Sequence, residues 1–314
     1  MKFAVALCLV AACAWGQEGT GPFPAILEQD PSLPTHTVYR PQDLSKVKGK
    51  LPIVAWGNGA CVNNGLAHRN FLMEIASHGY LAIAIGPPIA LPAQGKGAPK
   101  GGDGKQGAPK GEAKQGAPKG GGKQAAAAGP ATKSSQLIDA INWALAENSR
   151  KGSPYNGKLD ASKIAVMGMS CGGIQAYAVA TDPRVRLVGI FNSGILPAPS
   201  GPGAPAMEDV RKDQLDKLHS PIFYVTGDKT DIAYENGMDD FKRITKVPAI
   251  HTYKDGVSHG GTYNQPNGGD FARVAVAMLN WQLKGEKNES RFFLGVNCGL
   301  CQEAGWHVET KGYK

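Results

Sequence analysis

The sequence is poor in long apolar runs. After residue 16, no segment of the 314-residue chain stays apolar for the roughly 20 positions that a membrane-spanning helix needs. The apolar segment over residues 3–12 is shorter still, and it lies between Lys2 and the small-residue triplet Ala14-Trp15-Gly16. This order is typical of a signal peptide, so we predict that residues 1–16 are removed and that the protein is secreted or periplasmic. The alternative, a lipid anchor on Cys13, is disfavoured by the single positive charge and the short apolar segment.

Cysteine is scarce as well. Of six cysteines, four remain after the predicted cleavage, namely Cys61, Cys171, Cys298 and Cys301. In an exported protein we expect them to be oxidised, and four cysteines allow three pairings. Cys298 and Cys301 could also form half of a zinc site with His307, but a second pair of ligands is missing, which favours a local disulfide. No metal or organic cofactor is implied.

Residues 94–130 lack Val, Ile, Leu, Met, Phe, Trp, Tyr and Cys altogether, and repeat Gly-Ala-Pro-Lys-Gly three times. Such a segment cannot bury enough apolar area to offset its ordering entropy. We therefore predict a disordered insertion within one domain of residues 17–314. Its seven lysines against Asp103 and Glu112 supply +5 of the formal net charge of +8, so an anionic surface is its candidate partner. The rest of the chain is close to balanced, which predicts no nucleic-acid-binding face.

Elsewhere, apolar strands alternate with helical patterns. Strands are predicted at residues 37–39, 51–56, 80–85, 164–167, 187–191, 222–226 and 249–253. We expect the strand over residues 249–253 to be the last strand of the chain. Helices are predicted around residues 71–76, 135–145, 172–180, 207–218 and 271–279. The strand–helix–strand order over residues 51–85 is a βαβ unit, which requires a parallel sheet. We predict a monomeric α/β protein with a doubly wound, mostly parallel sheet and helices on both faces.

The pentapeptide Gly168-Met169-Ser170-Cys171-Gly172 separates a predicted buried strand from a predicted helix. Strand, sharp turn and helix is the context in which G-x-S-x-G presents a nucleophilic serine. The same pattern recurs around Ser258, but Gly-Thr-Tyr-Asn-Gln-Pro follows it and cannot begin a helix. Ser170 is therefore the candidate nucleophile, and the alternative is a helix-capping serine in a glycine-rich turn.

A serine hydroxyl needs a base, and the base needs an acid to orient it. His259 follows the predicted strand over residues 249–253 and is the candidate base. His251 lies within that strand and His219 precedes another, so we interpret both as structural. Asp231 and Asp228 follow the strand over residues 222–226 and compete as the acid. We favour Asp231, because it lies deeper in the loop and Asp228 is placed to cap the turn.

The tetrahedral intermediate of acyl transfer also needs backbone N–H donors for its oxyanion. One candidate is the N–H of Cys171, directly after the nucleophile. The other is the N–H of Asn58, in a loop whose two glycines let the backbone approach a substrate. The alternative for this loop is an ordinary glycine turn.

Five motifs, in chain order, resemble the α/β-hydrolase superfamily and its secreted cutinase-like branch of polyesterases and carboxylesterases. They are Thr37-Val38-Tyr39-Arg40-Pro41, Ala76-Ser77-His78-Gly79-Tyr80, Tyr155-Asn156-Gly157-Lys158-Leu159-Asp160, Met167-Gly168-Met169-Ser170-Cys171-Gly172-Gly173 and Ser258-His259-Gly260. The resemblance implies the α/β-hydrolase fold and a triad of Ser170, Asp231 and His259. It also implies oxyanion donors at Asn58 and Cys171.

The chain departs from the polyesterase branch at three places. That branch usually has an aromatic residue at the position of Asn58, a methionine at that of Cys171, and a tryptophan platform at Asn192-Ser193-Gly194-Ile195. The hydrolase fold would also bring Cys61 near Cys171, either as a disulfide or as two separate thiols.

The function expected from the sequence is hydrolysis of small or polymeric carboxylic esters by a secreted serine hydrolase. One alternative is a peptidase of the same fold. Another is a non-enzymatic protein of that fold, whose residues 94–130 bind anionic surfaces.

Overall fold

The computed structural model describes residues 19–89, 131–197 and 208–313. Nine strands in these residues form one sheet, in the order β1-β2-β4-β3-β5-β6-β7-β8-β9. The strands are β1 (Ala25–Glu28), β2 (His36–Pro41), β3 (Leu51–Gly57), β4 (Leu81–Ile85), β5 (Leu159–Met169), β6 (Val185–Phe191), β7 (Ile222–Gly227), β8 (Ala249–Lys254) and β9 (Trp306–Lys311). The six strands from β4 to β8 in this order are parallel, whereas the pairs β1–β2, β2–β4 and β8–β9 are antiparallel.

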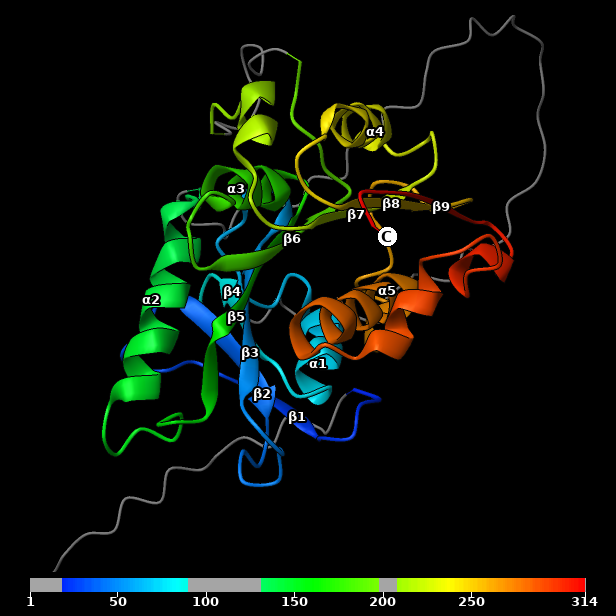
Figure 1. Cartoon of the computed structure of the whole chain (residues 1–314). Coiled ribbons are helices and arrows are strands. Elements are labelled where there is room, and N and C mark those ends of the chain that lie inside the picture. Colours follow the sequence, from blue (N-terminus) through cyan, green and yellow to red (C-terminus); the bar gives the residue numbers. More distant parts are fainter. Residues whose placement is uncertain (1–18, 90–130, 198–207, 314) are drawn as a thin grey trace, which may run out of the picture.

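Helices cover both faces of the sheet (Figure 1). On one face lie α2 (Ser135–Ser149), α3 (Cys171–Val179) and α4 (Tyr234–Arg243), and on the other lie α1 (Arg69–Ser77) and α5 (Gly269–Leu279). The central strands β3 and β4 are buried along their whole length, as expected for parallel strands covered on both sides. The predicted α/β class and mostly parallel sheet are thus confirmed.

The predicted helix over residues 207–218 is wrong. The described part of this segment forms only a short 3₁₀ helix, Lys212–Lys217. Its apolar residues Val210, Leu215 and Leu218 are five and three positions apart, so they do not recur on one face of an α-helix. A longer helix would therefore have no continuous apolar face to bury.

Two strands and one α-helix were not predicted. The strand over residues 249–253 is not the last, because β9 returns antiparallel to β8 and forms the sheet edge. At the opposite edge β1 pairs antiparallel with β2. Helix α4 buries Tyr234, Met238 and Phe241, whose spacing of four and three is helical.

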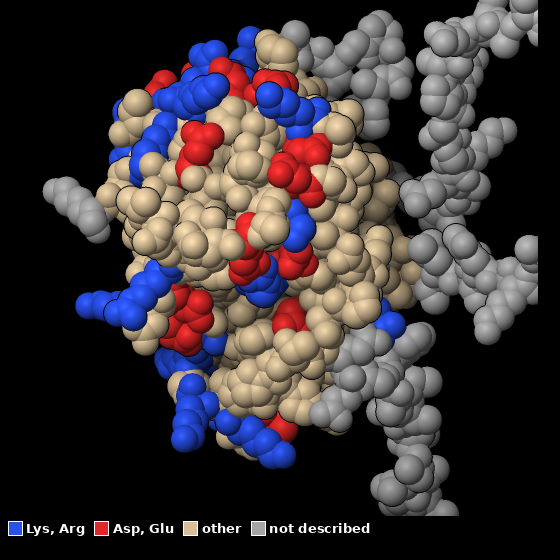
Figure 2. Space-filling view, turned by 90° about the vertical axis from the view of Figure 1, so that its right-hand side faces the viewer, with Lys and Arg blue, Asp and Glu red and all other residues tan. Residues whose placement is uncertain are grey.

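The predicted signal peptide (1–16) and insertion (94–130) lie outside the described residues. Within those residues, no helix is both long and apolar enough to cross a bilayer. The face in Figure 2 carries Lys and Arg interspersed with Asp and Glu, with no large area of one sign.

Candidate active site

Ser170 occupies a sharp turn between β5 and α3. Its backbone has φ 53° and ψ −118°, a region that non-glycine residues rarely adopt. A Cβ on Gly168 would overlap the carbonyl oxygen of Gly172, and a Cβ on Gly172 would overlap the backbone carbonyl of Gly57. Both glycines are therefore required by close backbone contacts, and the turn leaves the Ser170 side chain at the carboxyl end of the parallel strands.

The structure brings Ser170, His259 and Asp231 together at that end of the sheet. Ser170 Oγ lies 2.9 Å from His259 Nε2. On the other side of the ring, His259 Nδ1 lies 2.7 Å from Asp231 Oδ1. Because an ionised carboxylate only accepts hydrogen bonds, Nδ1 carries the proton and Nε2 is free to accept one from the serine.

Asp231 is buried, and its pKa reflects two opposing effects. Burial would raise the pKa of Asp231, but hydrogen bonds from His259, the Ala233 N–H and Asn192 outweigh it and hold the pKa below its ordinary value. The carboxylate therefore stays ionised at neutral pH. Asp228 is instead half-buried and accepts hydrogen bonds from Thr230 and from the Gly256 N–H, so it caps the turn and makes no hydrogen bond to the histidine.

The segments that carry the two expected oxyanion donors are in contact. Asn58 directly follows β3, and Cys171 is the first residue of α3. A Cβ on Gly172 would lie 2.7 Å from the Asn58 nitrogen, which places the two loops in contact. Among the described residues, neither N–H donates to a backbone carbonyl outside the helices and strands. Their role as oxyanion donors stays a prediction.

The side chain of Asn58 explains its place in this loop. It is fully buried, and its amide nitrogen donates to the carbonyl oxygens of Val62, Asn64 and Ile85 at 2.7–3.2 Å. These bonds hold the loop after β3 in one conformation, so the orientation of the Asn58 N–H is fixed before any ligand binds.

Cys61 and Cys171 form a disulfide, which links the loop after β3 to the start of α3. Of the two alternatives that the sequence left open, the disulfide is the one present. Cys298 and Cys301 form the predicted local disulfide, and His307 pairs with Asp255. Among the described residues, no group of three or more His, Cys, Asp or Glu side chains is arranged to hold a metal ion.

The structure adds residues that the sequence did not indicate. Asn192 and Ser193 follow β6, and both contact the site: Asn192 Nδ2 donates to Asp231 Oδ2 at 2.7 Å, and Ser193 Oγ donates to the Ser170 carbonyl at 2.7 Å. The hydroxyl of Tyr263 donates to Asn192 Oδ1. The only available signal was the position of two polar residues after the carboxyl end of a buried strand.

His251 and His219, which the sequence indicated as structural, make no hydrogen bond to Ser170, Asp231 or His259 among the described residues. His251 is fully buried in β8 among aromatic rings, and burial lowers its pKa to about 4. His219 Nε2 lies 3.1 Å from the Asp182 carbonyl.

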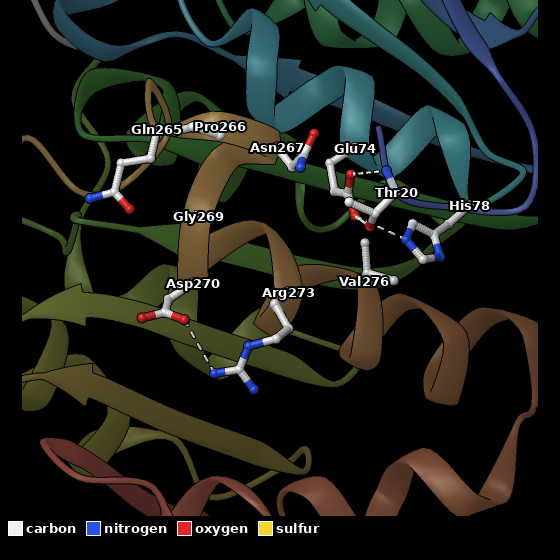
Figure 3. A pocket seen from close by; sticks show the side chains of 10 residues that line it. All are labelled: Thr20, Glu74, His78, Gln265, Pro266, Asn267, Gly269, Asp270, Arg273 and Val276. Atoms are coloured by element: carbon white, nitrogen blue, oxygen red, sulfur yellow. Dashed lines mark hydrogen bonds and ion pairs between the residues drawn. The ribbon is translucent and has the colours of Figure 1, made fainter. Parts of the chain in front are cut away.

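A separate pocket of about 410 Å³ lies between α1 and α5 and contains none of the triad residues (Figure 3). Glu74 on its wall accepts a hydrogen bond from the Thr20 N–H and is hydrogen-bonded to His78 Nε2. Asp270 on the facing helix pairs with Arg273. Since these charged side chains satisfy one another, the pocket presents no unpaired charge among the described residues to attract a ligand.

No protein-family model matches this chain, and no curated protein matches it.

Proposed function

We propose that this chain is a secreted serine hydrolase of the α/β-hydrolase fold that cleaves carboxylic esters through an acyl-enzyme. The observation that carries the proposal is the continuous hydrogen-bonded array from Ser170 Oγ through His259 to Asp231, with distances of 2.9 and 2.7 Å. The strained Ser170 backbone supports it, because such strain recurs at functional residues. The strand order, with a nucleophile turn after β5, supports the hydrolase fold.

In the first half of the reaction, Ser170 Oγ attacks the ester carbonyl carbon while His259 Nε2 accepts its proton. Asp231 stabilises the imidazolium through the Nδ1–H bond. The oxyanion of the tetrahedral intermediate accepts hydrogen bonds from the Asn58 and Cys171 N–H groups. His259 then protonates the departing alcohol, and the acyl group remains on Ser170.

The second half repeats these steps with water. His259 Nε2 takes a proton from water as its oxygen attacks the acyl carbon, and then returns that proton to Ser170 Oγ. The products are a carboxylic acid and the regenerated serine.

Two disulfides are typical of a protein from an oxidising compartment, which supports export.

The test is turnover of p-nitrophenyl esters of increasing acyl length, with a polyester film alongside. Ser170→Ala and His259→Ala should each lower kcat by several orders of magnitude while leaving the circular dichroism spectrum unchanged. Ser258→Ala is the matched control, because this exposed serine has the same pentapeptide pattern. A fluorophosphonate should label the wild type and Ser258→Ala, but not Ser170→Ala. Labelling of Ser170→Ala, or near-normal turnover by it, would refute the proposal.

A further inference from the structure

The carboxylate of Asp231 accepts four hydrogen bonds, two on each oxygen. Oδ1 accepts from His259 Nδ1 at 2.7 Å and from the Ala233 N–H at 2.9 Å. Oδ2 accepts from Asn192 Nδ2 at 2.7 Å and from the Gly227 N–H at 3.1 Å. Two of these donors are backbone groups. Among the described residues, Asn192 is thus the one side chain besides His259 that holds this carboxylate.

Asn192 is itself held on several sides. It is fully buried directly after β6, and its φ of 39° lies in the left-handed region, which asparagine tolerates better than most residues. Its backbone N–H donates to the Val225 carbonyl at 2.9 Å. The Tyr263 hydroxyl donates to Oδ1 at 2.5 Å. Backbone and side chain are therefore both fixed.

The network also determines which way the amide of Asn192 points. An ionised Asp231 can only accept, so the amide must turn its NH₂ group towards that carboxylate. The carbonyl oxygen then faces Tyr263, whose hydroxyl must donate. Burial and the nearby charge of Asp231 raise the pKa of Tyr263 well above its ordinary value, so the hydroxyl keeps its proton. A flipped amide would place its carbonyl oxygen against the Asp231 carboxylate and lose that hydrogen bond.

We propose that Asn192 is a positioning residue for Asp231, and that Tyr263 fixes Asn192 in turn. This inference rests on the proposed function. Asn192 holds Oδ2 so that Oδ1 faces His259 Nδ1, and its donated hydrogen bond stabilises the carboxylate charge. Asn192 is three hydrogen bonds away from the Ser170 hydroxyl, through Asp231 and His259, and it acts on the reaction only through Asp231.

Asn192→Gly is the first test, because glycine adopts the left-handed backbone without strain and removes the side-chain amide. We expect kcat for p-nitrophenyl butyrate to fall about 10- to 100-fold, as for a lost hydrogen bond to a charged group, with KM within about twofold. Asn192→Asp keeps the size of the side chain but places a second acceptor against Asp231, and should lose at least as much.

Asn280→Ala is a matched control, since Asn280 also accepts a hydrogen bond from a buried tyrosine hydroxyl, that of Tyr80. Tyr80 immediately precedes β4, at the amino end of the parallel strands and away from the triad. This variant should lose stability in urea but keep the wild-type kcat.

A double-mutant cycle separates positioning from a general structural effect. In an Asp231→Asn background, Asn192→Gly should lower kcat by no more than about twofold, because the group it acts through is already changed. An equal loss in both backgrounds, or a kcat within twofold of wild type for Asn192→Gly alone, would overturn the role of Asn192. A wild-type chain without turnover dependent on Ser170 would instead overturn the proposed function and this role with it.

Discussion

Removal of the Cys61–Cys171 disulfide should destabilise the protein much more than removal of the Cys298–Cys301 disulfide. The first bond joins residues 110 positions apart and the second joins residues three positions apart. A crosslink lowers the conformational entropy of the unfolded chain by an amount that grows with the logarithm of the loop length. On that relation the long loop contributes about 5 kcal/mol to the free energy of unfolding, and the short loop about 1.5 kcal/mol.

The comparison requires two double variants, Cys61→Ala with Cys171→Ala, and Cys298→Ala with Cys301→Ala. Both remove two sulfur atoms of which at least one is buried, so the loss of packing is similar and the loop length is the main difference. Urea unfolding followed by circular dichroism, extrapolated linearly to water, gives the two free energies. We expect the first variant to be less stable than the second by about 3 kcal/mol.

Equal losses of unfolding free energy in the two variants, or a larger loss for the variant without the short loop, would refute this reasoning.

The variant without the Cys61–Cys171 disulfide also reports on catalysis. Cys171→Ala keeps the backbone N–H expected to bind the oxyanion, so a lower kcat would measure the loss of geometry between the two loops and not the loss of a donor.

Three further outcomes are expected. Asp231→Asn should lower kcat by about 10⁴-fold, as for a triad acid, whereas Asp228→Asn should stay within about tenfold of wild type in the same ester assay. Gly172→Ala should lower the urea unfolding free energy by at least about 2 kcal/mol, because the added Cβ would overlap the backbone of Gly57. The buried ring of His251 has a pKa of about 4, so between pH 6.5 and 4 the unfolded chain binds a proton that the folded chain does not. As the pH is lowered from 6.5 to 4, the free energy of unfolding should therefore fall by about 3 kcal/mol. Urea unfolding of His251→Phe, measured across the same pH range, should show a correspondingly smaller fall.

The sequence supports a prediction of Ser170 and His259 because their signals are local. A strand, a glycine-flanked serine and a helix are all predicted within residues 164–180, and His259 follows the predicted strand over residues 249–253. The choice between Asp231 and Asp228 depends on where a loop turns back. In the structure the loop turns back so that Asp231 Oδ1 lies 2.7 Å from His259 Nδ1.

Asn192 could not be predicted from local sequence. Its contact with Asp231 exists because β6 and β7 are neighbours in the sheet and because the backbone turns into the left-handed region directly after β6. Similarly, β9 is separated from its partner β8 by more than 50 positions, and its alternating pattern is weak at the exposed edge. The buried residues Tyr234, Met238 and Phe241 of α4, by contrast, have a helical spacing that is visible in the sequence.

The disulfide between the loop after β3 and the start of α3 also determines what a proteolytic cut would do. All seven lysines of residues 94–130, each a potential trypsin site, lie between Cys61 and Cys171 in the chain. A protease that cut after any of them would leave two polypeptides joined through sulfur. One piece would carry Asn58 and the other Ser170, Asp231 and His259. Such a clipped protein would migrate as one band on a non-reducing gel and as two after reduction, and it would keep both halves of the site in a single covalent molecule.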